Sequence, residues 1–198
     1  MATTKRALNG RSSRTRILEA AAEALIAGGG DIEMGEVAKR AGVSTGLAYH
    51  YFSSKAGLLT ALINDFYDRY DAVSNQRMDG SEPWPSRERR RLEAVVRFLY
   101  EDPLAPVVFG AMGGSAEVVA TDVARQRAMV ALSAENIAHG QRAGHIGPDV
   151  DPLIAGAAII GGMRQAAATA LSAEVRPARE RVAEQLWSFI AGAVRLRA

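Results

Sequence analysis

The sequence of 198 residues contains no cysteine. This absence excludes disulfide bonds, thiolate metal ligands and cysteine nucleophiles, and it fits a reducing compartment. The first sixteen residues carry five Lys or Arg residues with no apolar run behind them, so no secretory signal is visible. We therefore expect a cytoplasmic protein.

Long apolar segments are missing as well. The longest uncharged apolar stretch has eleven residues, from Leu153 to Met163, and Arg164 ends it. A membrane-spanning helix needs about 18 or more such residues. We therefore expect a helix buried inside the protein and no membrane partner.

Recognisable catalytic patterns are also absent from the sequence. It contains no glycine-rich phosphate loop, Gly-x-Ser-x-Gly turn or dinucleotide fingerprint. His139 and His145 are six residues apart, a spacing that does not place paired metal ligands on one helix face. An enzyme would have to depend on carboxylates such as Glu117 and Asp122, which are more typical of a solvated face. The sequence thus predicts neither an enzyme nor a bound cofactor or metal.

Signals for β-strands are almost lacking. Alternating β-branched runs do not occur, whereas Ala, Leu, Glu and Arg recur at helical spacing. Pro83 and Pro85 are expected to forbid helix in the loop 76–86. The pattern predicts an all-α protein with about nine helices, at 14–27, 34–41, 45–51, 54–74, 87–100, between Asp102-Pro103 and Gly113-Gly114, and at 116–143, 152–171 and 177–196.

Positive charge is concentrated near the N-terminus. Residues 1–60 contain eight Lys and Arg residues against five Asp and Glu residues, whereas residues 61–198 contain sixteen against seventeen. A basic segment can contact the phosphates of nucleic acid. Basic tails also occur on proteins that bind no nucleic acid, so this feature leaves both alternatives open.

The segment from Met34 to Lys55 has the pattern of two short helices joined by a tight turn. Gly42 stands where a left-handed residue ends the first helix. Ser44 is placed to cap the second helix, and Phe52 is expected to point inward. This is the geometry of a helix-turn-helix, whose second helix enters the major groove of DNA. The alternative is an ordinary helical hairpin with an exposed, tyrosine-rich face.

The run from Met34 to Leu59 resembles the DNA-binding signature of the TetR (AcrR-like) family of repressors. The first helix with its terminal glycines is also similar, so the resemblance covers residues 14–62. Beyond them only the number and order of the helices agree. The matching positions are Val37-Ala38, Ala41-Gly42-Val43-Ser44, Gly46, Tyr49, Tyr51-Phe52, Lys55 and Leu58-Leu59.

The resemblance implies a partner, palindromic operator DNA, and a role for individual residues. Thr45, Gly46 and Leu47 would face base edges. The phosphate backbone would be contacted by Ser44, Tyr49, His50, Tyr51 and Lys55. The implied domains are a flexible basic arm at 1–11, a three-helix helix-turn-helix domain at 12–58 and a ligand-binding and dimerisation domain at 59–198.

Three positions depart from the family pattern. Glu33 stands where the family usually has a Ser or Thr cap, which puts a capping or phosphate contact in doubt. Ala48 replaces a residue that is commonly a larger aliphatic one. Ala56-Gly57 replace the acidic residues that commonly follow the lysine.

Aromatic residues gather in the middle of the chain, where seven of the twelve lie between Phe66 and Phe109. Members of the TetR family bind a small molecule among these helices, so the resemblance implies a pocket for an unidentified effector. Simple core packing is the alternative for each residue. The expected lining is Phe66, Tyr67, Tyr70, Trp84, Phe98, Phe109, Met112 and Met129.

The segment 152–171 is rich in Ala and Gly. Glycine weakens a helix by about 0.8–1.0 kcal/mol relative to alanine, so its presence favours close helix approach over helix propensity as the reason for this composition. The resemblance implies a homodimer held by the last two helices of each subunit, and packing within one chain is the alternative. The expected interface residues are Ala158, Gly161, Gly162, Leu186, Phe189 and Ile190.

We interpret the chain as a repressor that a ligand releases from its operator. The nearest alternative is an activator or architectural DNA-binding protein that has the same head and lacks an effector. A helical enzyme or a ligand carrier belongs to a different class. Four arginines at 87, 89, 90 and 91 could form a nucleic-acid patch, but they are more typical of the solvated start of a helix.

Overall fold

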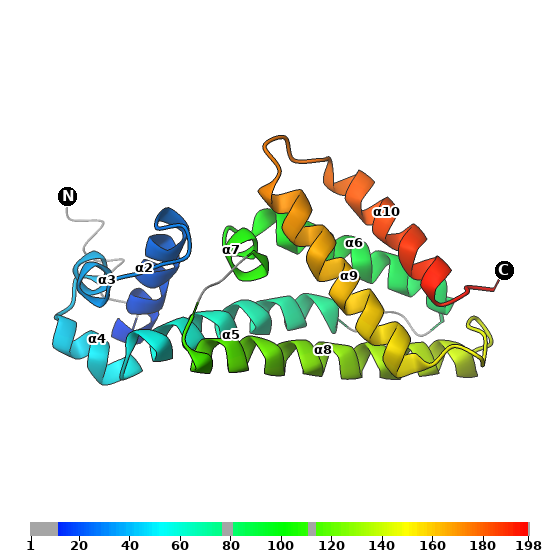
Figure 1. Cartoon of the computed structure of the whole chain (residues 1–198), viewed down its shortest axis with the longest axis horizontal. Coiled ribbons are helices and arrows are strands. Elements are labelled where there is room, and N and C mark those ends of the chain that lie inside the picture. Colours follow the sequence, from blue (N-terminus) through cyan, green and yellow to red (C-terminus); the bar gives the residue numbers. More distant parts are fainter. Residues whose placement is uncertain (1–11, 77–80, 111–113, 198) are drawn as a thin grey trace. The chain divides into compact units, whose positions relative to one another are not determined.

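The computed structural model describes residues 12–76, 81–110 and 114–197. These residues form nine helices and no strand, which confirms the all-α prediction (Figure 1). The predicted arm 1–11 and the predicted pocket residue Met112 lie outside the described residues. The helices are α2 (Ser13–Ala27), α3 (Met34–Ala41), α4 (Thr45–Phe52), α5 (Lys55–Ser74), α6 (Trp84–Glu101), α7 (Ala105–Phe109), α8 (Ala116–Arg142), α9 (Pro152–Ser172) and α10 (Arg179–Ala193).

The chain divides into two compact units. The first comprises residues 1–66 and 111–121, and the second comprises residues 67–110 and 122–198. The division falls within α5 and within α8, so each of these helices contributes residues to both units. The predicted domains, 12–58 and 59–198, divide the chain at a different position from these two units. They stay a prediction.

The first unit is built around α2, α3 and α4, whose bounds agree with the predicted helices to within one residue. The hydroxyl of Ser12 caps α2 by accepting from the backbone N–H of Thr15 at 3.2 Å. Ile17, Ala21 and Leu25 are buried on one face of α2, as their helical spacing predicts.

Helix α6 corrects one expectation about proline. It begins at Trp84, three residues before the predicted start, and therefore includes Pro85, which we expected to forbid helix. That expectation is wrong because a proline in the first turn removes an N–H group that has no partner within the helix.

Two further helices have different bounds from those predicted. Helix α7 is only five residues long and ends before Gly110 rather than at Gly113. It begins after Asp102, whose carboxylate accepts from the backbone N–H of Leu104 at 2.9 Å. Helix α10 begins at Arg179, two residues after the predicted Pro177.

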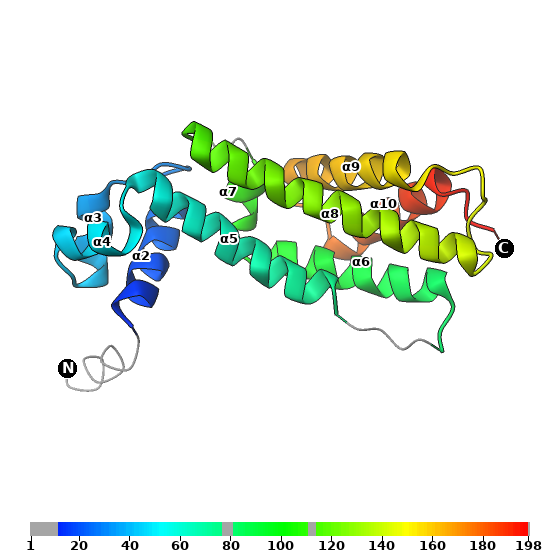
Figure 2. The ribbon, with the colours of Figure 1, turned by 90° about the horizontal axis from the view of Figure 1, so that it is seen from below.

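The second unit packs α10 against α6 and α9, and α9 also contacts α6 and α7. Helix α9 crosses α8 obliquely, as the two views together show (Figure 1, Figure 2). One apolar cluster joins four of these helices and the loop before α9, and a second joins α6 to α10. The first cluster contains Trp84, Ile137, Ile146, Val150, Ile159 and Val194, and the second contains Leu92, Val96, Ala183 and Leu186.

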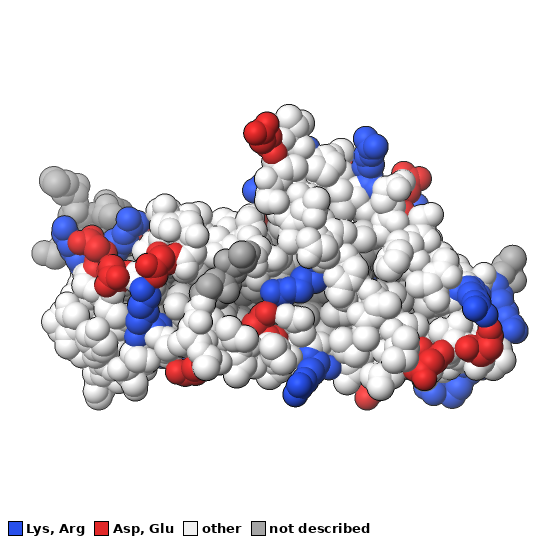
Figure 3. Space-filling view, in the orientation of Figure 1, with Lys and Arg blue, Asp and Glu red and all other residues white. Residues whose placement is uncertain are grey.

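Helix α9 is not buried in the way that we expected. Within the described ranges it is the one helix long and apolar enough to cross a membrane by length and composition, and only 22% of its most apolar window is buried. Leu153 and Ile154 are 58% and 68% exposed. The prediction of a buried helix is therefore wrong for one face of α9, and Figure 3 shows few charged side chains along it.

Substitution of Gly42 tests the turn between α3 and α4. Gly42 has φ = 65°, so Gly42→Ala should lower the free energy of unfolding by about 1–2 kcal/mol because alanine disfavours left-handed backbone. Gly35 is the matched control, since it lies inside α3 and a Cβ there would meet no atom within 4 Å. Gly35→Ala should stabilise by about 0.8–1.0 kcal/mol. Urea unfolding followed by circular dichroism measures both, and equal stability of the two variants would contradict this account of the turn.

Candidate nucleic-acid interface and ligand cavity

The turn between α3 and α4 presents one face of α4 to solvent. Gly42 ends α3, and its N–H donates to the carbonyls of Ala38 and Lys39. The hydroxyl of Ser44 accepts from the backbone N–H of Leu47 at 3.2 Å, which confirms the predicted cap. Phe52 is buried, as predicted, together with Ala48. The small side chain at position 48 therefore belongs to the core of this unit rather than to the exposed face.

The eight residues predicted to contact DNA lie on α4 or directly beside it. Tyr49 and Tyr51 are 46% and 42% exposed although they are large aromatic residues. The ring of His50 lies edge-on to that of Tyr51, with centroids 5.6 Å apart. The exposed members of the set are Ser44, Thr45, Gly46, Tyr49, His50 and Tyr51, and Leu47 and Lys55 are half-buried.

Lys55 is held by two acidic residues that precede α3. Its Nζ lies 2.6 Å from the Oδ1 atom of Asp31 and 3.8 Å from the Oε1 atom of Glu33. The hydrogen bond from Lys55 lowers the pKa of the Asp31 carboxyl, and the same bond raises the pKa of Lys55. Glu33 provides no side-chain cap for α3, so its carboxylate faces Lys55 instead of the helix end. Asp31 is not among the site residues that we predicted from the sequence.

The turn between α4 and α5 explains Gly57. A Cβ atom at this position would lie 2.2 Å from the carbonyl oxygen of Phe52, so no larger residue fits there. Ser53 has φ = 60° in the same turn, and the hydroxyl of Ser54 accepts from the N–H of Gly57 at 2.9 Å. This departure from the family pattern is therefore a requirement of the local backbone.

A cavity of about 500 Å³ lies in the second unit, between α5, α6, α8, α9 and α10. Three of the predicted pocket residues line it, namely Tyr70, Trp84 and Met129. Phe66 and Tyr67 are fully buried and lie outside the lining. Phe98 and Phe109 also lie outside it and pack beside Tyr70, with ring centroids 6.1 and 6.4 Å away.

Most of the lining was not predicted from the sequence. The cavity is bordered by Trp187 and Ile190 of α10, by Val194 directly after α10 and by Met163 of α9, although we assigned these two helices to dimerisation. The cavity is also bordered by Arg91, although we interpreted Arg91 as part of the solvated start of a helix. No sequence signal marks these residues, because five helices bring the lining together.

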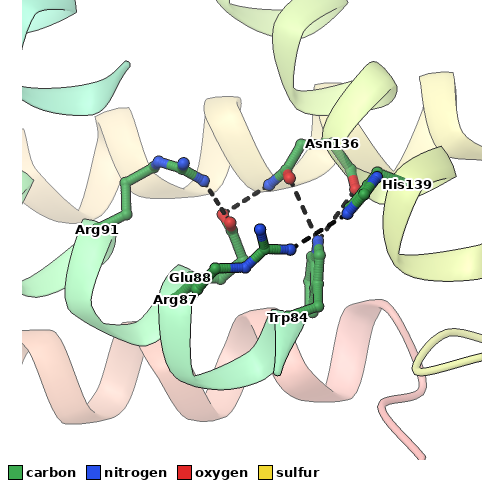
Figure 4. A network of polar contacts seen from close by, with 6 residues as sticks. All are labelled: Trp84, Arg87, Glu88, Arg91, Asn136 and His139. Atoms are coloured by element: carbon green, nitrogen blue, oxygen red, sulfur yellow. Dashed lines mark hydrogen bonds and ion pairs between the residues drawn. The ribbon is translucent and has the colours of Figure 1, made fainter. Parts of the chain in front are cut away.

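A polar network forms one wall of this cavity (Figure 4). Both carboxylate oxygens of Glu88 accept hydrogen bonds, one from Nη1 of Arg91 and the other from Nδ2 of Asn136 at 2.6 Å. The indole N–H of Trp84 donates to the backbone and side-chain oxygens of Asn136 at 3.1 and 3.2 Å. Beside them, Arg87 and His139 are 3.2 Å apart.

A second polar cluster surrounds Arg164, the sole charged residue of α9. Its guanidinium donates to the Tyr67 hydroxyl at 2.7 Å, to the Asp122 carboxylate at 3.0 Å and to the carbonyl of Val108 at 3.1 Å. The Tyr67 hydroxyl in turn donates to Asp122 at 2.6 Å. Burial and this bond to Asp122 raise the pKa of Tyr67. The cluster therefore fixes α5, α7, α8 and α9 at one level of the second unit.

The predicted interface residues fall into two groups. Ala158 and Gly161 are exposed, and Phe189 is 46% exposed. Gly162 instead faces its own chain, since a Cβ atom there would lie 3.1 Å from the ring of Phe189. Leu186 is buried within the chain and Ile190 is half-buried beside it.

Comparison with known proteins identifies a family model and relatives that match part of the chain. The sequence model of the family described as "Bacterial regulatory proteins, tetR family" matches residues 17–62. The HTH-type transcriptional regulator BetI of Escherichia coli O127:H6 is 41% identical over 85 residues. That match spans 42% of this chain and 42% of BetI.

Solved structures resemble nearly the whole chain. A Rhodococcus sp. protein described as a TetR-family transcriptional regulator has a TM-score of 0.76 at 24% identity, with 92% of this chain and 98% of that chain covered. AibR, solved with isovaleryl coenzyme A and operator DNA, has a TM-score of 0.66 at 20% identity, with 94% and 100% covered. At these identities the likeness shows a shared fold.

Removal of one hydroxyl tests the cluster around Arg164. Tyr67→Phe should lower the free energy of unfolding by about 1–3 kcal/mol because two half-buried charged groups, Arg164 and Asp122, each lose a hydrogen bond. The matched control is Tyr100→Phe, which removes a hydroxyl that donates to the carbonyl of Pro177 at 3.0 Å in a half-buried position. This control substitution should lower the free energy of unfolding by about 0.5–1.5 kcal/mol.

The raised pKa of Tyr67 also predicts that the stability of the protein depends on pH, which Tyr67→Phe tests against the unaltered protein. An unfolded tyrosine ionises near pH 10, whereas the raised pKa of Tyr67 keeps its proton on the folded chain at that pH. Stability of the unaltered protein should therefore fall as the pH rises above about 10, where the unfolded chain binds fewer protons. Tyr67→Phe should remove this part of the decline. Identical declines in both proteins, measured by urea unfolding, would contradict the prediction.

Proposed function

Because this chain belongs to the TetR family of transcriptional regulators, we propose that it is a sequence-specific DNA-binding repressor that a small molecule releases from a palindromic operator. The observation that carries the proposal is the exposed face of α4, where large aromatic and small polar residues lie together at a helix-turn-helix. An activator with the same DNA-binding head remains the second candidate, since the contacts with DNA are the same for both.

The proposed DNA contacts divide into two kinds. Thr45, Gly46 and Leu47 begin α4, where small side chains let the backbone approach base edges in the major groove. The phosphates would be contacted by Ser44, Tyr49, His50, Tyr51 and Lys55, which position the helix without reading the sequence. The Ser44 hydroxyl accepts from Leu47, so its own proton stays available to a phosphate.

Lys55 would have to exchange partners when it binds DNA. Its ammonium group is bound to Asp31 in the free chain. Both side chains are substantially exposed, 38% for Lys55 and 75% for Asp31, and exposed ion pairs contribute little stability. A phosphate can therefore replace Asp31 at small cost.

The proposed effector site is the cavity of the second unit. Its volume is within the range of small-molecule pockets, which is about 300–1,000 Å³. Helix α5 contributes Lys55 to the first unit and Tyr70 to the second, so one helix carries both a proposed phosphate contact and a cavity wall. A hundredfold loss of operator affinity would need about 2.7 kcal/mol of coupling between the two sites.

We also propose that the protein is a cytoplasmic homodimer without enzymatic activity. The exposed, weakly charged face of α9 and the 46% exposed ring of Phe189 support a second copy as the partner. A dimer places two recognition helices on major grooves about 34–36 Å apart, or a multiple of this distance. Regulation of transcription by the family requires access to DNA and no catalysis.

Loss of Lys55 and of Thr45 should affect DNA binding in different ways. Lys55→Ala should weaken binding to every duplex and reduce the salt dependence by about one unit of slope, because one phosphate contact is lost. Thr45→Ala should change the preference among duplexes instead. Fluorescence anisotropy with a palindrome selected from random DNA measures both. Arg90→Ala is the matched control, since Arg90 is exposed and paired with Glu82 in the second unit.

Asp31→Asn completes this experiment as a double-mutant cycle. It should raise the affinity several-fold in the unaltered protein, because Lys55 no longer has to leave Asp31. In the Lys55→Ala background Asp31→Asn should raise the affinity only as much as the control Glu36→Gln does. Glu36→Gln removes an exposed negative charge from the same unit. Equal gains in both backgrounds would reject the exchange of partners, and unchanged affinity of Lys55→Ala would reject the phosphate contact itself.

Ala158→Glu tests the dimer. Ala158 is exposed in the chain, so a monomer tolerates glutamate there, whereas an unpaired charge buried at an interface costs about 3–5 kcal/mol. Sedimentation should show a dimer for the unaltered protein and for Ala72→Glu, an exposed position on α5, and a monomer for Ala158→Glu. Gly162→Leu is a poorer test because leucine would clash with Phe189 of the same chain. A monomeric unaltered protein at micromolar concentration would refute the proposed dimer.

A further inference from the structure

Two Nε atoms of the polar network at the cavity wall are buried without a hydrogen-bond partner, those of Arg87 and Arg91, and Arg87 does not line the cavity. Nη1 of Arg91 donates to Glu88, but the Nε atom of Arg91 is buried and has no hydrogen-bond partner. Arg91 does line the cavity. A buried donor without a partner costs free energy, so an acceptor brought by a ligand would remove this cost.

The rest of the network holds Arg91 in place. Glu88 is 12% exposed, and its second oxygen is occupied by Asn136. Asn136 in turn is oriented by the indole of Trp84. Glu88 accepts on both oxygens and holds Nη1 of Arg91, while the Nε of the same guanidinium is buried without a partner.

The charges around the cavity disfavour an anionic ligand. Three acidic residues line it, Asp71, Glu88 and Glu135, against two basic ones, Arg91 and Arg142. The positive charge of Arg91 is already paired with Glu88. Asp71 shares Arg125 with Asp68, and the closer contact, 2.5 Å against 3.4 Å, is with Asp68. A carboxylate ligand would therefore meet uncompensated negative charge.

The remaining walls require an apolar ligand body. Leu92 and Val95 of α6, Met129 of α8, and Ile159 and Met163 of α9 line the cavity away from the polar network. The volume of about 500 Å³ suits a molecule of modest size. Methionine side chains adapt to irregular apolar shapes, so they do not select one particular outline.

We infer that the cavity binds an uncharged, mainly apolar molecule that carries a carbonyl oxygen, and that Nε of Arg91 donates a hydrogen bond to this oxygen. Esters, lactones, ketones and amides share this chemistry. The inference rests on the proposed function only in treating the cavity as the effector site, and it names the chemical class of the effector.

Tryptophan fluorescence provides a direct measurement of binding. The sequence has two tryptophans, and both Trp84 and Trp187 line the cavity. Titrations with methyl octanoate, octanoate and octylamine at pH 7 compare a neutral carbonyl, an anion and a cation on equal chains. Methyl octanoate should give a saturable change with an affinity at least about tenfold higher than either charged compound. Octylamine lacks an acceptor for the hydrogen bond from Arg91, and octanoate would meet the negative charge around the cavity.

Arg91→Lys tests the assigned donor. Lysine keeps the positive charge beside Glu88 but lacks the Nε–H edge of the guanidinium. The variant should bind methyl octanoate about tenfold more weakly, which corresponds to one charged hydrogen bond. Arg90→Lys is the matched control because Arg90 is exposed and does not line the cavity. Circular dichroism checks that both variants fold.

Three results would overturn the inference. The first is tighter binding of octanoate or of octylamine than of methyl octanoate, and the second is no saturable binding of any probe. The third is equal affinity of Arg91→Lys and of the unaltered protein for methyl octanoate. Anisotropy with operator DNA, measured without any probe, reports the proposed function separately. Normal DNA binding together with one of these results would reject the ligand class alone, whereas absent DNA binding would reject the proposed function and leave the fluorescence result standing.

Discussion

The left-handed backbone at Gly42 is the constraint on which the proposed DNA-binding face depends. With φ = 65°, the chain reverses within the residues from Gly42 to Ser44, and Ser44 then caps α4. This turn buries Ala48 and Phe52 and leaves Tyr49 and Tyr51 on the outside. A residue with a Cβ atom would oppose this backbone by about 1–2 kcal/mol. The exposure of the two tyrosines therefore depends on this turn.

The helix-turn-helix could be predicted from sequence because its determinants are local. Gly42, Ser44 and the spacing of buried residues all act within a few residues of one another, and each has its own stereochemical meaning. The cavity could not be predicted in this way, because residues of five helices line it. Glu88 and Arg91, three residues apart, have the spacing of a solvated ion pair. Their burial follows from α8, which brings Asn136 against Glu88, and no local pattern encodes that contact.

The sequence also does not determine which face of a helix packs against another helix and which face is exposed to solvent. The composition of α9 predicts close packing, yet two adjacent glycines have different surroundings: Gly161 has open space around it and Gly162 contacts Phe189 of its own chain. They lie about 100° apart around the helix, and only the position of α10 determines which of the two faces is covered. Pro85 illustrates the same limit at a helix end, since a proline is tolerated in the first turn and disruptive two turns later.

The electrostatics of the two units bear on how a ligand can release DNA. Coupling between sites typically supplies about 1–3 kcal/mol, so an operator complex held by too many strong ionic contacts would outlast any effector. Asp31 and Glu33 face Lys55 in the first unit and would reduce the net gain from its proposed phosphate contact. In the second unit Glu88 pairs with Arg91, and the buried Nε of Arg91 is the donor proposed for a neutral oxygen. On the proposed function, acidic residues beside both sites keep each affinity moderate, and moderate affinity is what allows the modest coupling free energy to exchange one partner for the other.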